Sequence, residues 1–246
     1  MSYTANICPV ENLTTRIKEL MEDFLSLVYP NICICCDEPM VKQEKIICSN
    51  CNIDLPRTYF HLLENNPIEQ LFWGRVPIEK ATSYFLFQKG SRYQKLLHYL
   101  KYKGLREIGV EMGKRFAAEL QQNSYFENTD VIVPVPLHPK KERKRGYNQS
   151  LAIAEGLAFN LKKELEPDNL YRKHYSETQT RKGRFERWEN VSDLFDVREP
   201  DRFSNKHVLL VDDVVTTGST LEACTQALQK YSPVKVSIAT LAFAAI

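Results

Sequence analysis

The stretch 207–222, HVLLVDDVVTTGSTLE, constrains the fold of this chain more than any other part of its sequence. Four apolar residues after the first histidine have the pattern of a short buried strand. Two carboxylates, Asp212 and Asp213, follow this strand, and a turn rich in hydroxyl groups comes next. Apolar residues at helical spacing follow the turn, and Ser219 and Glu222 are spaced as a capping box. The stretch therefore predicts a strand, a turn and a helix in succession.

The hydroxyl-rich turn has the chemistry of a phosphate site. Main-chain N–H groups at the start of a helix carry partial positive charge, and Gly218 lets the backbone approach an anion closely. No lysine follows this glycine, which distinguishes the turn from the loop that grips a triphosphate. Because carboxylates accept hydrogen bonds from sugar hydroxyls, two acids before the turn favour a ribose held at its diol and its 5′-phosphate. A plain strand–turn–helix connection, in which polar residues only cap the helix, is the alternative.

This order of residues closely resembles the phosphoribosyl pyrophosphate (PRPP) signature of type I phosphoribosyltransferases. That signature is an apolar strand, two acids, two further residues and T-T/A-G-x-T, and it matches here without a gap. The resemblance implies an α/β fold with a parallel sheet flanked by helices, and PRPP bound together with Mg²⁺. It also implies that Asp212 and Asp213 face the ribose hydroxyls. The residues implied to wrap the 5′-phosphate are Thr216, Thr217, Gly218, Ser219 and Thr220.

Two pairs of cysteines predict a metal site near the N-terminus. The ligands expected from the spacing Cys-x2-Cys-x11-Cys-x2-Cys are Cys33, Cys36, Cys48 and Cys51. Four thiolates can close a tetrahedron around a structural Zn²⁺, which leaves no open position for catalysis. Disulfides are the competing interpretation, but they are rare where thiols are kept reduced, and we see no secretion signal. Cys35 lies between two expected ligands and could compete with Cys36.

A cluster of cations follows the apolar stretch 130–136, which we expect to be a buried strand. In open α/β sheets ligands bind beyond the carboxyl ends of the strands. We therefore expect a basic loop on the same rim as the phosphate turn, where it could contact a pyrophosphate or a single-stranded nucleic acid. A solvated basic run is the alternative. The candidates are Lys140, Lys141, Arg143, Lys144 and Arg145, followed by Asn148 and Gln149.

The polar stretch 175–187, YSETQTRKGRFER, is expected to be a mobile flap. In the transferase family such a loop closes over PRPP and excludes water, a role that polar loops can serve. An ordinary surface loop is the alternative. The flap residues that could reach the pyrophosphate are Arg181, Lys182, Arg184 and Arg187.

The rest of the chain predicts an alternation of strands and helices. We expect strands over 82–87 and 234–240, and helices over 12–28, 91–103, 107–122 and 149–163, with 53–80 as linker and loop. The expected domains are a helix and zinc knuckle at 1–56, a segment at 57–125 that could form a hood, and a core at 126–246. No apolar run approaches the length of a membrane span, and we expect a cytoplasmic protein without membrane insertion.

Together these motifs resemble the competence-protein ComF family, which is also described as amidophosphoribosyltransferase-like. The resemblance rests on the four-cysteine knuckle, LKYKG at 100–104, PVPLHPKKERKRGYNQ at 134–149 and the PRPP signature. A further match follows the flap, at Gln179, Arg187, Asn190 and Phe195. The resemblance implies a protein linked to DNA uptake, which receives or processes an incoming single strand and could dock to the uptake machinery.

Three functions stay open on the sequence alone. The chain could bind PRPP with Mg²⁺ and act in DNA uptake, with or without transferring the sugar. It could instead be a metabolic transferase that attaches phosphoribose to a nucleobase or an amine. It could also have lost its chemistry and sense PRPP while it binds nucleic acid. The sequence assigns no catalytic residue, because transfer by this fold depends on positioning and charge stabilisation rather than on one acid or base.

Overall fold

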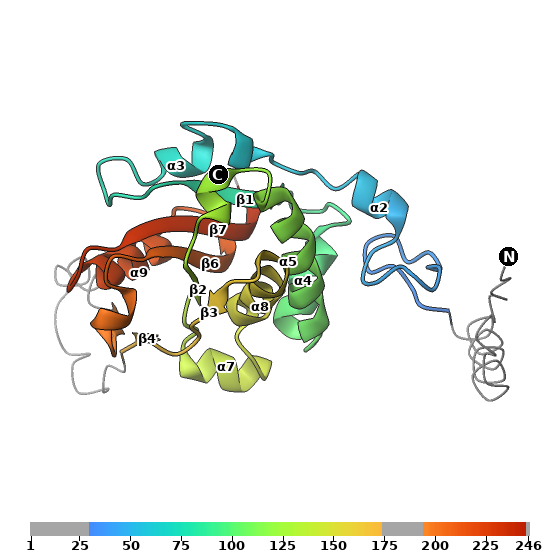
Figure 1. The fold of residues 1–246 in the computed structure, drawn as a ribbon. Helices are drawn as coiled ribbons and strands as arrows, with labels where there is room; N and C mark the ends of the chain where they lie inside the picture. The colour runs from blue at the N-terminus through green and yellow to red at the C-terminus, as the bar shows by residue number, and fades with distance from the viewer. Residues whose placement is uncertain (1–29, 174–193, 245–246) are drawn as a thin grey trace, which may run out of the picture. The chain divides into compact units, whose positions relative to one another are not determined.

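The computed structural model describes residues 30–173 and 194–244, and the chain divides into two compact units, Met1–Asn52 and Ile53–Ile246 (Figure 1). The helix expected over 12–28 lies outside the described residues. In the first unit the described part is a small knuckle, which α2 (Ser49–Ile53) follows at the boundary between the units.

A parallel sheet of five strands forms the centre of the second unit (Figure 1). Its strand order is β1-β7-β6-β2-β3, and each neighbouring pair is parallel. The strands are β1 (Ala81–Leu86), β2 (Val131–Pro134), β3 (Glu164–Leu165), β6 (His207–Val215) and β7 (Lys235–Phe243). The inner strands are apolar and buried on both faces, as strands of parallel sheets are. The predicted α/β fold with a parallel sheet flanked by helices is confirmed.

Helices cover both faces of this sheet. The long helices are α4 (Gln94–Tyr102), α5 (Arg106–Leu120), α8 (Gln149–Leu161) and α9 (Ser219–Gln229). On one face, α9 packs on a buried cluster that includes Val208 and Leu210 of β6. The α5–α8 pair lies over the opposite face. These two helices approach so closely that a Cβ on Gly156 would lie 2.1 Å from the carbonyl oxygen of Val110.

Most of the predicted elements are present within a few residues of their expected bounds. Strands expected over 82–87, 130–136 and 234–240 correspond to β1, β2 and β7, and the helix expected over 149–163 corresponds to α8. The two expected helices around Gly104 correspond to α4 and α5, and the glycine has φ +70° between them. A residue in that conformation ends a helix, which explains the break.

The interpretation of 53–80 as linker and loop is wrong in part. This segment contains a 3-10 turn (Phe60–Leu62) and the short helix α3 (Pro67–Gln70). The side chain of Asn66 accepts hydrogen bonds from two backbone N–H groups of α3 and donates to the carbonyls of Phe60, Leu63 and Ala81. Buried Ile68 and Phe72 then join the core. The tertiary contacts of Asn66 hold a segment that has no periodic pattern of its own.

The basic stretch expected as a loop is also different, because it forms the helix α7 (Pro139–Arg145). A proline at the first position fits a helix start, and the His138 side chain accepts a hydrogen bond from the N–H of Lys140 at 3.1 Å. Gly146 ends the helix in the left-handed region with φ +84°. Two further short helices are α6 (Ser124–Glu127) and a 3-10 turn (Pro200–Phe203).

One buried histidine makes the stability of the second unit sensitive to acid. His61 is 2% exposed, and among the described residues neither ring nitrogen has a hydrogen-bond partner. Burial lowers the pKa of His61 below 6.5, so at acid pH the unfolded chain binds a proton that the native state does not. The contribution of this group to stability therefore becomes unfavourable as the pH falls below about 6.5.

We expect His61→Leu to gain stability relative to the wild type when the pH falls from 8 to 5.5, because leucine binds no proton in either state. Urea unfolding of both proteins at the two pH values measures this change in the stability difference. His98→Leu, at an exposed position, is the matched control. A stability difference between His61→Leu and wild type that is equal at both pH values would contradict the expectation.

Candidate functional site

Strand β6 places the two acids at the carboxyl end of the sheet, between β2 and β7. The strand is longer than expected, so Asp212 and Asp213 lie inside it rather than after it. Asp212 is held by the hydroxyl of Ser150, the second residue of α8, which donates to Asp212 Oδ1 at 2.8 Å. Asp213 forms an ion pair with Lys101 of α4, with 3.0 Å between Oδ2 and Nζ. Side chains from two helices therefore converge on the acid pair.

The carboxyl group of Asp212 has a raised pKa. Burial, and then the neighbouring charge of Asp213, raise the pKa of Asp212 to about 7, although its hydrogen bonds from Ser150 and from the Asp213 N–H act in the opposite direction. Near neutral pH a large fraction of Asp212 therefore carries a proton in the unliganded protein. Carboxylates with strongly raised pKa values gather at functional sites, because a folded chain keeps such a group at the expense of stability.

The turn after β6 has its glycine in the left-handed region and lines a small cavity. Gly218 has φ +76°, and a Cβ at this position would lie 3.1 Å from the ring of Phe72. The hydroxyl oxygens of Thr217 and Ser219 lie 3.1 Å apart. The turn and Asp212 line a cavity of about 50 Å³. All five turn residues expected from the sequence line it: Thr216, Thr217, Gly218, Ser219 and Thr220.

The capping box expected at the start of α9 is wrong. Ser219 is the first helical residue rather than the cap, and Gly218 occupies the cap position with no side-chain cap hydrogen bond among the described residues. Glu222 forms an ion pair with Arg75, from the segment before β1. The first N–H groups of α9 are therefore not capped by their own side chains, as an anion site at a helix start requires.

The basic residues lie at the same edge of the sheet, since α7 follows β2 and β2 pairs with β6 up to Val211. All residues of α7 are exposed or half-buried. Asn148 caps α8 by accepting from the Ser150 N–H at 3.1 Å and donates to Val135 O at 3.0 Å. Gln149 is buried and accepts from the Arg145 guanidinium. These two amides hold the α7–α8 junction in place, directly beside the serine that contacts Asp212.

A second cavity, of about 280 Å³, lies on the α4 side of the acid pair. Lys101 and Tyr102 line it together with Thr216 of the phosphate turn. Tyr102 is 63% exposed, and the Arg145 guanidinium lies 5.8 Å from the centre of its ring. The remaining lining residues are Phe87, Gln94, Leu97, His98, Val214 and Ala244.

The flap candidates cannot be placed. Arg181, Lys182, Arg184 and Arg187 lie outside the described residues, as do Gln179 and Asn190. The antiparallel strands β4 (Leu170–Arg172) and β5 (Phe195–Val197) bracket that part of the chain.

In the first unit, the structure brings the four expected cysteines together. The Sγ atoms of Cys33, Cys36, Cys48 and Cys51 all lie within 4.8 Å of one another, so the cluster could hold a metal ion. The Cys36 and Cys48 sulfurs are 3.7 Å apart. A tetrahedral zinc site with Zn–S bonds of about 2.3 Å has sulfurs about 3.8 Å apart, so the donor set fits zinc. Cys35 is buried and lies outside this four-sulfur cluster.

Comparison with known proteins agrees with this geometry. Residues 144–245 match the phosphoribosyl transferase domain. The DNA utilization protein YhgH of Escherichia coli K12 is 26% identical over 217 residues, 87% of this chain and 91% of the relative. Competence protein F of Haemophilus influenzae is 34% identical over 118 residues, 46% of this chain and 50% of the relative. Competence protein ComFC of Bacillus subtilis is 30% identical over 146 residues, 59% of this chain and 57% of the relative.

These matches support a ComF-family, phosphoribosyltransferase-like protein. The family resemblance predicted from the sequence is thereby confirmed. Within the parts of the chain that the structure describes, no helix is both long enough and apolar enough to cross a membrane.

Three side chains at the candidate site were not among the residues predicted from the sequence. Ser150 directly follows the predicted Asn148 and Gln149, so its position beyond a strand end was a usable signal. Lys101 belongs to the basic and aromatic KYKG stretch, which could equally have been a solvated helix end. Arg75 lies in the segment interpreted as a linker, and no local pattern indicates its contact with the turn.

Proposed function

We propose that this ComF-family chain binds PRPP with Mg²⁺ at the rim formed by the acid pair and the phosphate turn, and that it handles incoming single-stranded DNA in competence. The observation that carries the proposal is the half-buried acid pair directly beside a hydroxyl-lined cavity at the start of α9. The charge on the acids suits the ribose diol, and the uncapped helix start suits a phosphate.

Each part of the site has a distinct task in this proposal. The turn 216–220 donates N–H and O–H groups to the 5′-phosphate, while Asp212 and Asp213 accept hydrogen bonds from the ribose hydroxyls. Lys101 must leave Asp213, at least in part, for the ribose to bind there. The carboxylate oxygens of the pair suit Mg²⁺, which when bound with PRPP would neutralise charge on the pyrophosphate.

The cations of α7 are proposed to serve the pyrophosphate or the DNA backbone. If the sugar is transferred, charge develops on the departing pyrophosphate, and cations at the rim stabilise it. The candidates on α7 remain Lys140, Lys141, Arg143 and Arg145, and those beside it remain Asn148 and Gln149. The candidates of the flap remain Arg181, Lys182, Arg184 and Arg187.

A role with DNA is supported by the name of the relative DNA utilization protein YhgH, and a single strand is supported by chemistry. Proteins that bind single strands combine a cationic groove with aromatic side chains on which bases stack. Here the exposed ring of Tyr102 lies beside the Arg145 guanidinium, at the end of the cationic helix α7. Docking to a DNA-uptake assembly and a cytoplasmic location are part of the same proposal.

A metabolic phosphoribosyltransferase is the second candidate function. The largely apolar cavity of about 280 Å³ beside the acid pair favours it, because a planar nucleobase needs such a space next to the sugar. Its walls come mainly from α4, within the 57–125 segment proposed as a hood.

We propose a structural role for zinc in the cysteine cluster. Four thiolates fill a tetrahedral coordination shell, so the metal would hold the knuckle together and would not take part in transfer.

Calorimetric titration of PRPP with Mg²⁺ into the full, zinc-loaded chain tests the central proposal. We expect binding that changes when a short single-stranded oligonucleotide is present, since both ligands use one rim. Binding that ignores the oligonucleotide would favour the metabolic candidate, which release of pyrophosphate with nucleobases would then test. No PRPP binding would remove both.

Gly218→Val and Asp213→Asn are the variants that test the site itself. Valine cannot adopt φ +76° without strain, and its Cβ would meet the ring of Phe72 at 3.1 Å. Asparagine removes the charge that faces the diol. We expect each to abolish measurable PRPP binding while the far-ultraviolet circular dichroism spectrum stays that of a folded protein. Unchanged affinity in both variants would refute the proposed site.

A further inference from the structure

One arginine from outside the phosphate turn, Arg75, forms hydrogen bonds with residues of the turn. Arg75 donates through Nη1 to the carbonyl of Thr217 at 2.8 Å and to the carbonyl of Leu71 at 2.8 Å. Its Nη2 contacts the hydroxyl of Ser219 at 3.4 Å and forms the ion pair with Glu222. A single guanidinium thus joins the segment before β1 to the turn and to the first helical turn of α9.

The segment that carries Arg75 is anchored to the core of the second unit. Asn66, 3% exposed, ties the start of α3 to the carbonyls of three residues, and Phe72 is 1% exposed in the core. The ring of Phe72 also lies against Gly218. Gly74 has φ +71° and turns the chain so that Arg75 can reach α9. The segment that contacts the phosphate turn is therefore anchored to the core on both sides of α3, at Asn66 and Phe72.

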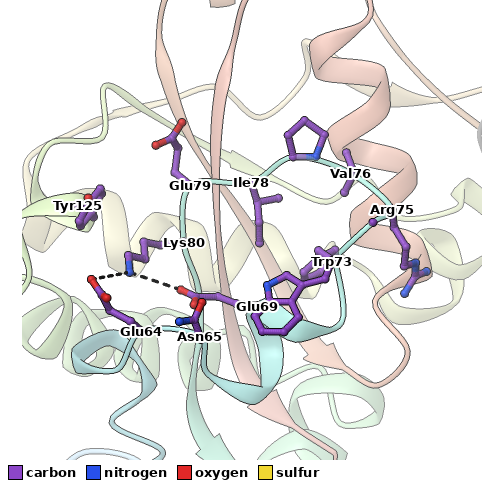
Figure 2. Close-up of a pocket in the computed structure, with 13 residues that line it drawn as sticks. Glu64, Asn65, Glu69, Trp73, Arg75, Val76, Ile78, Glu79, Lys80 and Tyr125 are labelled. Atoms are coloured by element: carbon purple, nitrogen blue, oxygen red, sulfur yellow. Dashed lines mark ion pairs between the residues drawn. The ribbon is translucent and has the colours of Figure 1, made fainter.

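The segment before β1 also lines a cavity of about 720 Å³. Figure 2 shows the residues that line it. Lys80 lies there with its ammonium 3.9 Å from the carboxylates of both Glu64 and Glu69. Arg75 extends from the opposite side of the cavity, away from this charge cluster. The guanidinium is thus directed to the turn and α9, where its contacts lie.

We propose that Arg75 is a positioning residue for the 5′-phosphate, an inference that rests on the proposed function. Its charge is paired with Glu222, and its donors meet a turn carbonyl and a turn hydroxyl. The guanidinium therefore acts by holding Thr217 and Ser219 in the geometry that accepts a phosphate. Preorganised sites lose affinity when their supporting contacts are removed, even though the ligand-contacting groups remain.

Two substitutions separate positioning from charge. Arg75→Gln removes both the charge and the forked set of guanidinium donors. Arg75→Lys keeps the charge, but a single ammonium cannot contact the Leu71 carbonyl, the Thr217 carbonyl and the Glu222 carboxylate at the same time. We expect both variants to weaken the binding of ribose 5-phosphate and of PRPP by about tenfold, the size expected for losing a charge-assisted contact. We expect the affinity for pyrophosphate with Mg²⁺ to stay within about twofold of wild type.

Calorimetry with the full, zinc-loaded chain measures these affinities, and hydrogen exchange of the unliganded protein gives a readout independent of any ligand. We expect faster exchange in 216–220 in both variants, because the turn opens more often without its support. Arg202→Gln, which removes the ion pairs of Arg202 with Glu164 and Glu166, is the matched control and should leave both readouts unchanged.

Several results would overturn the inference. Wild-type affinity in Arg75→Lys would mean that charge alone suffices, and an equal loss for ribose 5-phosphate and pyrophosphate would mean a general defect. Unaltered exchange and affinity in both variants would show that the turn does not need its support. A wild-type chain that binds none of these ligands would overturn the proposed function together with this inference. Binding by the wild type and unchanged binding by the variants would overturn the inference alone.

Discussion

Replacing Cys33 or Cys48 by serine is expected to remove the metal and to unfold the knuckle of the first unit. The four sulfurs lie within 4.8 Å of one another, and the structural zinc proposed for this cluster would hold the knuckle together. Structural zinc contributes an apparent binding free energy of about 10–16 kcal/mol in zinc-finger peptides. A knuckle this small cannot replace that contribution with apolar burial. Metal analysis of the reduced proteins and limited proteolysis across 30–52 measure the two effects.

Cys35→Ser is the matched control for these variants. Cys35 is buried in the same knuckle but lies outside the four-sulfur cluster, so this variant should keep one zinc per chain. Less than one zinc per chain in the reduced wild type would count against the structural zinc. Full metal content in Cys33→Ser would show that another group can complete the site.

Local patterns were sufficient to predict the parts of this protein that depend on neighbours in sequence. The strand, the acids and the turn lie within one continuous stretch, and the two cysteine pairs each span four residues. Such motifs form their geometry locally, so spacing alone identifies them. The parallel order of β1, β7, β6 and β2 confirms the fold that those motifs implied.

Long-range contacts were not predictable in the same way. The capping box failed because Glu222 pairs with a residue 147 positions earlier, and a pattern read along the chain does not contain that partner. The segment 53–80 was interpreted as a linker because its order depends on tertiary hydrogen bonds of Asn66 rather than on periodicity. The basic stretch formed helix α7 where a loop was expected, although Pro139 and Gly146 mark its ends.

Replacing Asp212 by asparagine is expected to weaken PRPP binding by about 10- to 100-fold, the loss that follows when a charged acceptor becomes neutral. The same substitution is expected to stabilise the unliganded protein. Asparagine has nearly the shape of aspartate, and its Oδ1 can still accept from the Ser150 hydroxyl and from the N–H of residue 213. The substitution removes the Asp212 carboxylate, whose charge is disfavoured by desolvation and by the neighbouring charge of Asp213.

The stabilisation has a definite pH dependence. Burial, and then the charge of Asp213, raise the pKa of Asp212 in the folded protein from its ordinary value of 3.8 to about 7. Between these pH values the native state retains a proton that the unfolded chain has lost, so the wild type loses stability as the pH rises. Because the variant does not titrate, its advantage should be small near pH 4, should grow with pH and should level off above about pH 7. Urea unfolding of both proteins from pH 5 to 8.5 measures this difference.

Asp196→Asn is a control of opposite sign. Burial of Asp196 acts to raise its pKa, but hydrogen bonds from Lys173 and from the Val197 N–H outweigh burial, and the pKa is lowered. This variant should therefore be less stable than wild type at neutral pH. If Asp212→Asn were also less stable at pH 8, Asp212 would be a structural residue and the acid pair would not be kept for a ligand. A more stable variant that no longer binds PRPP would show that the chain retains an unfavourable buried carboxylate because the ribose requires it.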